Sequence, residues 1–409
     1  MGGMVFHEHA NGCNTEKIAA SPQFRGTDKH YSSSISAVPK TFDIVTYGGV
    51  PNGDITQALR NAWNDACASN VSSIVMVPRG TFKMHGLALY GSCKAPIEVK
   101  VDGIIQGPEN PSDLQNEKTW LTFSDIDSFT LSGSGIFDGQ GVSHPWTQDD
   151  CTKQNAGTCK PYNLAFNSVN NLVIRGVTTK DSRGFHVNVN GCNNVTIDDF
   201  TVSAPANSIN TDGLHISKST NVSVVNSRIG TGDDCVSLGA GDKQIMVQNV
   251  NCGPGHGFSV GSLGGNPKEL PVDGFTVRNC TLNGTSNGVR VKTWADKPGN
   301  ISISNLFFED ITMINVQNPI IIDQEYCPSK DCPNKKPSKI QISNVTFKNI
   351  RGTSAFQYAV VLNCSKEKPC QNVQFNNVDI KLSNGSLPLA TCINVDPIEI
   401  GKATPSCKP

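Results

Sequence analysis

The sequence predicts an all-β fold, a single right-handed parallel β-helix with one α-helix capping its N-terminal end. A five-residue motif, in which apolar and polar residues alternate before a closing Asn, Gly or Asp, recurs along the chain. Its closing positions lie 23 to 39 residues apart, at residues 176, 199, 226, 249, 279, 305, 344 and 377. Short strands in units of this length are typical of a stacked solenoid. Hairpin dipeptides are scarce between the runs, which argues against an antiparallel sandwich or barrel.

The N-terminal part of the chain differs from this repeat. Residues 1–40 are polar, rich in serine and without a hydrophobic period, so we expect a flexible arm ahead of a β-helix domain at residues 41–409. A helix is predicted from about Asp54 to Ala68, with Asp54 as its N-cap. Its apolar residues share one face, which would cover the open end of the stack: Ile55, Leu59, Ala62, Trp63 and Ala66.

Each predicted coil carries a second short strand, as at residues 185–187, 214–216, 258–260, 289–291 and 320–322. Stacked coils bring equivalent turn residues together, so a recurrent Asn can form a ladder of side-chain amides. An isolated turn Asn in the left-handed conformation, without a ladder, explains the same pattern equally well. The candidates are Asn226, Asn249, Asn279, Asn305, Asn344 and Asn377.

Composition excludes some classes of protein and favours export. The net charge is −1, so the chain has no basic surplus for nucleic acid, and no run reaches the ~18 apolar residues of a membrane helix. Fifteen cysteines and several Asn-x-Ser/Thr sequons, including Asn70, Asn194, Asn221 and Asn384, fit an exported glycoprotein. Residues 1–25 contain no apolar leader region, so we expect an exported protein whose leader is not part of this sequence.

Candidate catalytic residues lie just ahead of the second strands. Asp212, Asp234 and His256 are 22 residues apart in both intervals, and each precedes its predicted strand by two positions. Coils in register would stack these side chains along one edge. Carboxylates brought together in this way raise one another's pKa, and their repulsion destabilises the fold. Such a cluster is therefore usually kept for function.

Four segments around this row resemble the signatures of the polygalacturonases, glycoside hydrolase family 28. They are Asn210-Thr211-Asp212, Gly232-Asp233-Asp234, Gly255-His256-Gly257 and Arg290-Val291-Lys292, where the family has Ile at the middle position of the last. The resemblance covers roughly residue 41 to the C-terminus and is greatest to plant enzymes, including pollen-type ones. It implies a right-handed β-helix and inverting hydrolysis of α-1,4 bonds in polygalacturonic acid (pectin). It also implies a secreted, monomeric cell-wall enzyme without metal or cofactor.

The resemblance implies a role for each carboxylate. Asp233 would be the general acid that protonates the leaving oxygen, while Asp212 and Asp234 would hold and deprotonate a water. The chemistry of adjacent carboxyl groups is consistent with these roles, since one of the neighbours Asp233 and Asp234 can stay protonated near pH 5 while the other ionises. His256 would tune the protonation of the acid.

The remaining site candidates would bind substrate. Arg290 and Lys292 alternate along a strand and so face the same side, where they would bind the substrate carboxylate. Tyr326 matches a family tyrosine, and Asn210 would orient substrate or Asp212. His186, expected one coil earlier in register with His215, is a further candidate for a substrate contact; a structural histidine is an equally good interpretation.

Cysteine spacing suggests several disulfides, although connectivity stays open at this stage. Four pairs would close small loops: Cys151–Cys159, Cys327–Cys332, Cys364–Cys370 and Cys392–Cys407. A Cys235–Cys252 bridge would clamp the turn that carries Asp233 and Asp234, and Cys67–Cys93 would tie the helix to the first coils. Cys192 and Cys280 are predicted to be buried thiols, and Cys13 is left over.

Other functions remain open from the sequence. Exo action is favoured by the pollen-type resemblance over endo action. A hydrolase of decorated pectin, such as xylogalacturonan or rhamnogalacturonan, is an alternative, although Arg290 and Lys292 suit galacturonate. A Ca²⁺-dependent pectate lyase shares the predicted fold. A silent wall-binding β-helix is disfavoured, because all three carboxylates are present.

Overall fold

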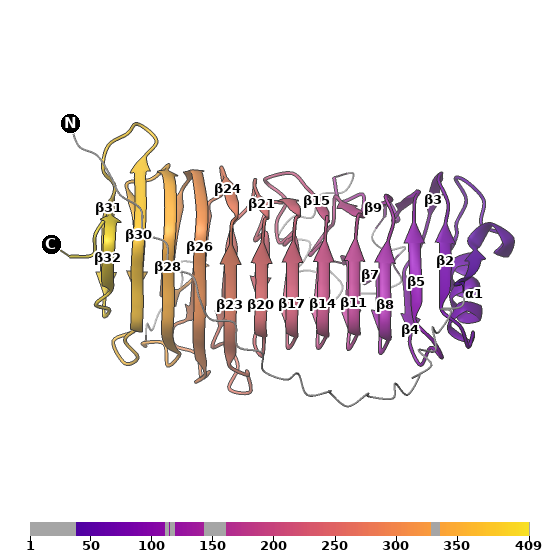
Figure 1. The fold of residues 1–409 in the computed structure, drawn as a ribbon, viewed down its shortest axis with the longest axis horizontal. Coiled ribbons are helices and arrows are strands. Elements are labelled where there is room, and N and C mark those ends of the chain that lie inside the picture. Colours follow the sequence, from indigo (N-terminus) through magenta and orange to yellow (C-terminus); the bar gives the residue numbers. More distant parts are fainter. Residues whose placement is uncertain (1–37, 111–113, 115–118, 143–160, 329–335, 409) are drawn as a thin grey trace, which may run out of the picture. The chain divides into compact units, whose positions relative to one another are not determined.

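The structure, a computed structural model, describes residues 38–110, 114, 119–142, 161–328 and 336–408. All but the last three residues of the expected N-terminal arm therefore lie outside the described residues. Every strand pair in the described chain is parallel, and successive strands of one row belong to successive coils, as Figure 1 shows from indigo to yellow. The predicted parallel β-helix is confirmed. No helix among the described residues is long and apolar enough to cross a membrane.

The strands form three rows along the stack. The first is an eleven-stranded sheet that carries the candidate site. Its strands are β4 (Leu87–Tyr90), β7 (Thr119–Ser124), β10 (Tyr162–Asn167), β13 (Val187–Asn190), β16 (Leu214–Ser217), β19 (Val236–Leu238), β22 (Phe258–Leu263), β25 (Asn287–Trp294), β27 (Asn318–Tyr326), β29 (Tyr358–Asn363) and β31 (Leu389–Ile393).

The other two rows merge toward the C-terminus, where β26 pairs with both β23 and β24. One row comprises β1 (Lys40–Asp43), β2 (Ser73–Val77), β5 (Ile97–Val101), β8 (Asp127–Ser132), β11 (Asn170–Arg175), β14 (Asn193–Asp198), β17 (Thr220–Val225), β20 (Lys243–Gln248), β23 (Val272–Arg278), β26 (Ser302–Val316), β28 (Gln341–Ser354), β30 (Gln371–Leu382) and β32 (Ile398–Thr404). The third row comprises β3 (Thr81–Lys83), β6 (Ile104–Gln106), β9 (Ile136–Asp138), β12 (Thr178–Lys180), β15 (Thr201–Ser203), β18 (Arg228–Gly230), β21 (Asn251–Cys252) and β24 (Thr281–Asn283).

The predicted capping helix is α1 (Thr56–Cys67), beside β2 at the N-terminal end of the stack (Figure 1). A short 3₁₀ helix, η1 (Ile44–Tyr47), precedes it. Trp63 is buried, and its ring lies 5.8 Å from that of Phe123, so the helix closes the core of the first coils. Asp54 lies one residue ahead of the cap position, but its carboxylate still accepts a bond from the Thr56 N–H at 2.9 Å.

The asparagine ladder is confirmed in part, and its turn residues also adopt the left-handed conformation. Asn249 donates to Asn226 at 3.0 Å, and Asn279 donates to Asn249 at 2.8 Å. Asn305 then donates to Asp273 instead, which starts a second run through Asn344. The next member is Asn372, not Asn377 as predicted. The Asn377 amide oxygen faces the Lys402 N–H at 3.4 Å.

Asn249→Ala is expected to destabilise the fold by about 1–2 kcal/mol, because it removes two ladder bonds and places a Cβ-bearing residue without a compensating amide at φ 57°. Asn249→Gly is the matched control, since Gly adopts positive φ freely and loses only the amide. Denaturant unfolding should therefore rank wild type above Gly and Gly above Ala. Equal stability of Ala and Gly would contradict a contribution from the left-handed turn.

Four of the six predicted disulfides are present in the described chain: Cys67–Cys93, Cys235–Cys252, Cys364–Cys370 and Cys392–Cys407. Cys327 is also disulfide-bonded, and its predicted partner Cys332 lies outside the described residues, as do Cys13, Cys151 and Cys159. Cys192 and Cys280 are buried free thiols, as predicted.

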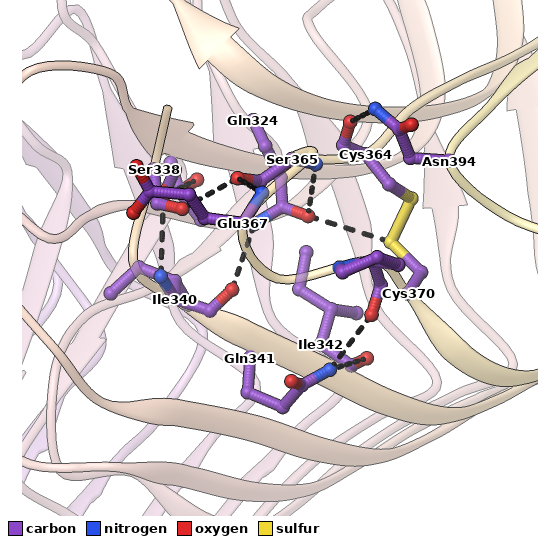
Figure 2. The surroundings of a disulfide bond; sticks show 12 residues. Gln324, Ser338, Ile340, Gln341, Ile342, Cys364, Ser365, Glu367, Cys370 and Asn394 are labelled. Carbon is purple, nitrogen blue, oxygen red and sulfur yellow. Dashed lines mark hydrogen bonds between the residues drawn. A yellow bond between two sulfur atoms is a disulfide. The ribbon is translucent and has the colours of Figure 1, made fainter. Parts of the chain in front are cut away.

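Figure 2 shows how the Cys364–Cys370 disulfide is anchored to its neighbours. The buried Gln324 side chain donates to the Ile340 carbonyl at 2.9 Å and accepts from the Ser365 N–H at 3.0 Å. Because Gln324 lies in β27, these bonds tie that strand to the loops of the following coils. This network fixes the end of β27, where Tyr326 is located.

Candidate active site

The strand register stacks the predicted row. Leu214 pairs with Val236, and Val236 pairs with Phe258. The register therefore advances from coil to coil by the same spacing that separates Asp212, Asp234 and His256. The Gly213 N–H donates to the Asp234 carbonyl at 2.9 Å, which extends the ladder across the turn. The three side chains therefore lie at one edge of the eleven-stranded sheet, ahead of β16, β19 and β22.

The turns around the row are tightly packed, which explains a glycine in this motif. At Gly257, φ is +81°, and a Cβ would lie 2.2 Å from both the Asn287 and Gly288 carbonyl oxygens. Only glycine fits this close approach. The Cys235–Cys252 disulfide follows directly after the Asp233–Asp234 turn and links it to the next coil. The turn is therefore held from both sides.

Asp234 is a buried carboxylate surrounded by donors. It accepts bonds from Arg290 Nη2 at 2.7 Å, from Lys292 Nζ at 2.9 Å and from Ser259 Oγ at 2.7 Å. Burial alone would raise the pKa of Asp234, but Arg290 and Lys292 reverse this effect and hold it below its usual value. Asp234 is therefore an ionised group at the centre of the site.

Asp212 lies in a different environment, although it is also buried. Burial raises the pKa of Asp212 well above its ordinary value, and the charges of Asp234 and Asp233 raise it further. The Ser237 hydroxyl opposes this shift by donating to Asp212 Oδ2 at 2.6 Å, and Lys292 opposes it by its charge. Two neighbouring carboxyl groups thus have pKa values that are displaced in opposite directions.

Asp233 is paired with His256. Asp233 Oδ1 lies 2.8 Å from His256 Nδ1 and accepts the Asp234 N–H at 2.9 Å. The His256 N–H donates to the Asp233 carbonyl at 2.7 Å, so backbone and side chain together fix the pair. The Asp233 side chain keeps 18% of its surface exposed, which makes it the accessible one of the two adjacent carboxyl groups.

Ligand atoms of Asp233, Asp234 and His256 lie within 4.8 Å of one another, a spacing at which a metal ion could bind. The donor set does not favour one, because Arg290 and Lys292 already occupy both oxygens of Asp234. Two cations at this position would repel a third. The charge of Asp234 is therefore neutralised by the protein itself.

The substrate-binding candidates are distributed around this cluster. Lys292 Nζ lies 5.6 Å from the centre of the Tyr326 ring, and Trp294 contacts the same ring at 5.1 Å. Asn210 is exposed ahead of Asp212. A cavity of about 250 Å³ begins at Thr211, next to Asp212, and Arg183 and Ile209 contribute to its lining. The cavity therefore reaches the residue before Asp212, but none of the three carboxylates of the site lines it.

His186 is the one candidate that the structure places away from the site surface. It is 0% exposed, and its Nδ1 lies 3.3 Å from Thr179 Oγ1 inside the coil. Burial lowers the pKa of His186 to about 3, so it is a neutral core histidine. Nor is it in register with His215, which pairs with Asn188. The prediction that His186 contacts substrate is therefore wrong.

Comparison with known proteins places this site in a family. Residues 67–407 match the sequence profile described as glycosyl hydrolases family 28. The chain belongs to this family. As a family 28 protein, it is 53% identical over 369 residues to a polygalacturonase of Medicago sativa, covering 90% of this chain and 87% of that protein. It is 43% identical over 369 residues to an exopolygalacturonase of Platanus acerifolia, covering 90% and 97% respectively.

Solved structures of pectin-related hydrolases share the fold. An endo-xylogalacturonan hydrolase from Aspergillus tubingensis matches with a TM-score of 0.75 and 21% identity, covering 88% of this chain and 100% of that one. An exopolygalacturonase from Thermotoga maritima matches with a TM-score of 0.69 and 18% identity, covering 89% and 92%. At these identities the likeness establishes the parallel β-helix of this family 28 chain, and no more.

Sequence reasoning missed several side chains of this family 28 site. Ser237 and Ser259 bond the two buried carboxylates, and His215 Nδ1 lies 2.8 Å from Ser237 Oγ. The rings of Tyr162, Phe185 and His215 form a stack with 4.7 Å between neighbouring centres. A signal was available for the two serines, because they repeat the spacing of the catalytic row. Nothing in the sequence marks the aromatic stack.

Proposed function

We propose that this protein hydrolyses the α-1,4 bonds between galacturonic acid residues of polygalacturonate, with inversion at the anomeric carbon. The observation that carries the proposal is the cluster of three carboxylates with Arg290 and Lys292 bound to Asp234. It combines acid–base groups with the positive charge that an anionic sugar requires. The polygalacturonases among its relatives support the same substrate.

Asp233 is the general acid in this mechanism. Its neighbour Asp234 is held ionised by two cations and is buried, whereas Asp233 is the exposed member of the pair and can reach the substrate. His256 Nδ1, at 2.8 Å, orients the Asp233 carboxyl group through Oδ1 and leaves Oδ2 to face the leaving oxygen. Protonation of that oxygen from Asp233 breaks the glycosidic bond.

Asp212 and Asp234 hold the attacking water. Asp234 accepts a hydrogen bond from the water as a fixed anion, whereas Asp212 is the stronger base once ionised, because its pKa is raised by burial and by the neighbouring carboxylates. The water gives its proton to Asp212 as its oxygen bonds to the anomeric carbon. The rate of hydrolysis should therefore fall as the pH is lowered and Asp212 becomes protonated.

Arg290 and Lys292 bind the substrate carboxylate with the N–H groups that Asp234 does not use. Arg has five N–H donors and Lys three, so one bond to Asp234 leaves both able to bind a second anion. Tyr326 and Asn210 would contact the same sugar or its neighbour. Secretion to the cell wall and a monomeric state complete the proposal, and the disulfides fit an oxidising compartment.

Exo action is our proposed mode, and it is supported by relatives named exopolygalacturonases from Platanus acerifolia and Oenothera organensis. Exo action requires loops that close one end of the cleft, and the sequence offers three candidates, residues 141–161, 261–273 and 328–338. In the first and the last, residues 143–160 and 329–335 lie outside the described residues. In the segment 261–273, residues 261–263 belong to β22, and Glu269 braces the loop by accepting from the Gly264 N–H at 2.6 Å.

The products of polygalacturonic acid test this function. Chromatography of early products should give monomer alone for exo action, and mixed oligomers would show endo action instead. Proton NMR should show the β-anomer first if the α-linkage is inverted. Activity should persist in a metal chelator. Unsaturated uronates, or loss of activity in chelator, would identify a lyase and overturn the proposal.

A further inference from the structure

The two buried carboxylates share one arrangement. In each case a serine hydroxyl from the following coil donates to the carboxylate. A basic side chain from a strand next to the serine also contacts that hydroxyl. Ser237 Oγ lies 2.6 Å from Asp212 Oδ2 and 2.8 Å from His215 Nδ1. Ser259 Oγ lies 2.7 Å from Asp234 Oδ1 and accepts from Arg290 Nε at 3.0 Å. Strand register explains the match, since His215, Ser237, Ser259 and Arg290 are paired one after another.

The basic residue that contacts the serine determines which protonation states of the carboxylate the serine hydroxyl can bond. Arg290 can only donate, so the single proton of Ser259 must point to Asp234. A neutral imidazole can donate or accept at Nδ1, and burial lowers the pKa of His215 to about 4, which keeps the ring neutral above that pH. Ser237 can therefore donate to an ionised Asp212, or accept from a protonated one and donate to His215.

We propose that Ser237 and His215 are positioning residues that hold Asp212 in both of its protonation states, whereas Ser259 and Arg290 hold Asp234 in the ionised state only. The inference rests on the proposed function, in which Asp212 takes a proton in each turnover and must return it. A carboxyl group that cycles requires partners that suit both forms. A carboxylate that only supports charge does not.

Other charged or titratable groups also face Asp212 from the neighbouring coils. They are Asp233 and Asp234 on the turn before β19, Lys292 on β25 and the phenol of Tyr162 on β10. Their charges remain in a variant that loses only the Ser237 hydroxyl. The change in such a variant therefore reports the hydrogen bonds that run from His215 through Ser237 to Asp212, which we call the relay. It does not report the electrostatic effect of the surrounding charges.

Ser237→Ala is the central test, with kcat and KM on polygalacturonate measured across pH. We expect kcat to fall about 10- to 100-fold and KM to stay within about twofold. The acid limb of kcat/KM should move up by about one pH unit, because the bond from Ser237 to ionised Asp212 is charge-assisted and therefore stronger than its bond to protonated Asp212. Ser237→Thr keeps a hydroxyl and should restore most of both effects. His215→Phe keeps a ring to stack on Phe185 and should move the limb in the same direction by less.

Ser259→Ala is the matched contrast. It should lower kcat without moving the acid limb, since Arg290 Nη2 and Lys292 still bind Asp234 directly. Ser223→Ala, on β17 in a different row of strands, should leave activity and the profile unchanged. Thermal unfolding checks that each variant is folded. An unshifted acid limb in folded Ser237→Ala, or equal limb shifts in the two serine variants, would overturn the proposal.

A second readout does not depend on turnover. Carboxyl ¹³C NMR titration of the full chain, with Asp212→Asn to identify the resonance, should show a higher pKa for Asp212 in Ser237→Ala than in wild type. An inactive wild type that shows this shift would refute the proposed function and leave the relay standing. An unchanged Asp212 titration would refute the relay whatever the activity.

Discussion

Asp233→Asn is expected to abolish hydrolysis of polygalacturonate while the protein stays folded. The amide cannot supply a proton to the leaving oxygen, and loss of a general acid costs about 10²- to 10⁴-fold in rate. Asn has the same shape as the protonated acid. Its Oδ1 can keep both contacts of the Asp233 carboxyl group, to the Asp234 N–H at 2.9 Å and to His256 Nδ1 at 2.8 Å. The defect should therefore appear in kcat and not in stability.

The measurement is kcat on polygalacturonic acid from reducing ends released, together with thermal unfolding of the same samples. Asp125→Asn is the matched control, because Asp125 is exposed, is remote from the catalytic row along the stack and has a φ of 57° that Asn also tolerates. Its activity should equal that of wild type. Folded Asp233→Asn with turnover within tenfold of wild type would remove Asp233 from the role of acid.

The fold was predictable because its two main determinants are local. Alternating apolar residues give the strands, and an Asn in the left-handed conformation follows some of them directly, as at Asn226 and Asn249. The ladder partner is a matter of register and is harder to predict. Asn305 reaches Asp273 and not Asn279, because Ser304 pairs with Asp273 and Asn305 therefore lies before the apolar pairs of β23, whereas Asn279 follows them. Asn372 replaces Asn377 for the same reason, since Ser343 pairs with Gln371.

The site was predictable where spacing and register coincide. The coils from β16 to β22 are equal in length, so equal spacing in the sequence became proximity in space. The coil before them is longer, and there Val187 pairs with Leu214. His186 lies one position before the first of these partners, whereas His215 lies one position after the second. This mismatch in register separates a core histidine from one that contacts Ser237.

Single polar residues with a common structural role were not predictable as special. Serine is frequent in this chain, so the spacing that Ser237 and Ser259 share with the catalytic row is recognised as a signal only once the carboxylates they bond are seen. Asp242 is a similar case. It follows Gly239-Ala240-Gly241, a sequence typical of an exposed turn, yet its side chain is 0% exposed. Its neighbour in the preceding coil is Ser219, whose N–H donates to Asp242 Oδ1 at 2.9 Å.

Asp242 should make the native state lose stability as the pH rises from about 4 to 8. Burial raises the pKa of Asp242 to about 8, because Oδ2 has no hydrogen-bond partner in the described structure and water cannot reach it. The native state therefore holds this proton more tightly than the unfolded chain, whose Asp pKa is about 3.9. The resulting stabilisation is complete below about pH 4 and declines as pH rises toward 8. Between pH 5 and 8 the loss amounts to about 4 kcal/mol from this group.

Asp242→Asn tests this dependence, since the amide carries no charge at any of these pH values. Its buried N–H group lacks a partner, so the variant should be less stable than wild type at pH 5. Its free energy of unfolding should nevertheless fall much less between pH 5 and 8, so that the two curves converge or cross near pH 8. Asp212 also contributes a pH slope, but equally in both proteins, and the difference between the curves isolates Asp242. The measurement is a series of denaturant titrations across this pH range. If the curves for Asp242→Asn and wild type run parallel, the Asp242 carboxyl is not the buried acid described above. Asp125→Asn is the control, and its curve should run parallel to that of wild type throughout.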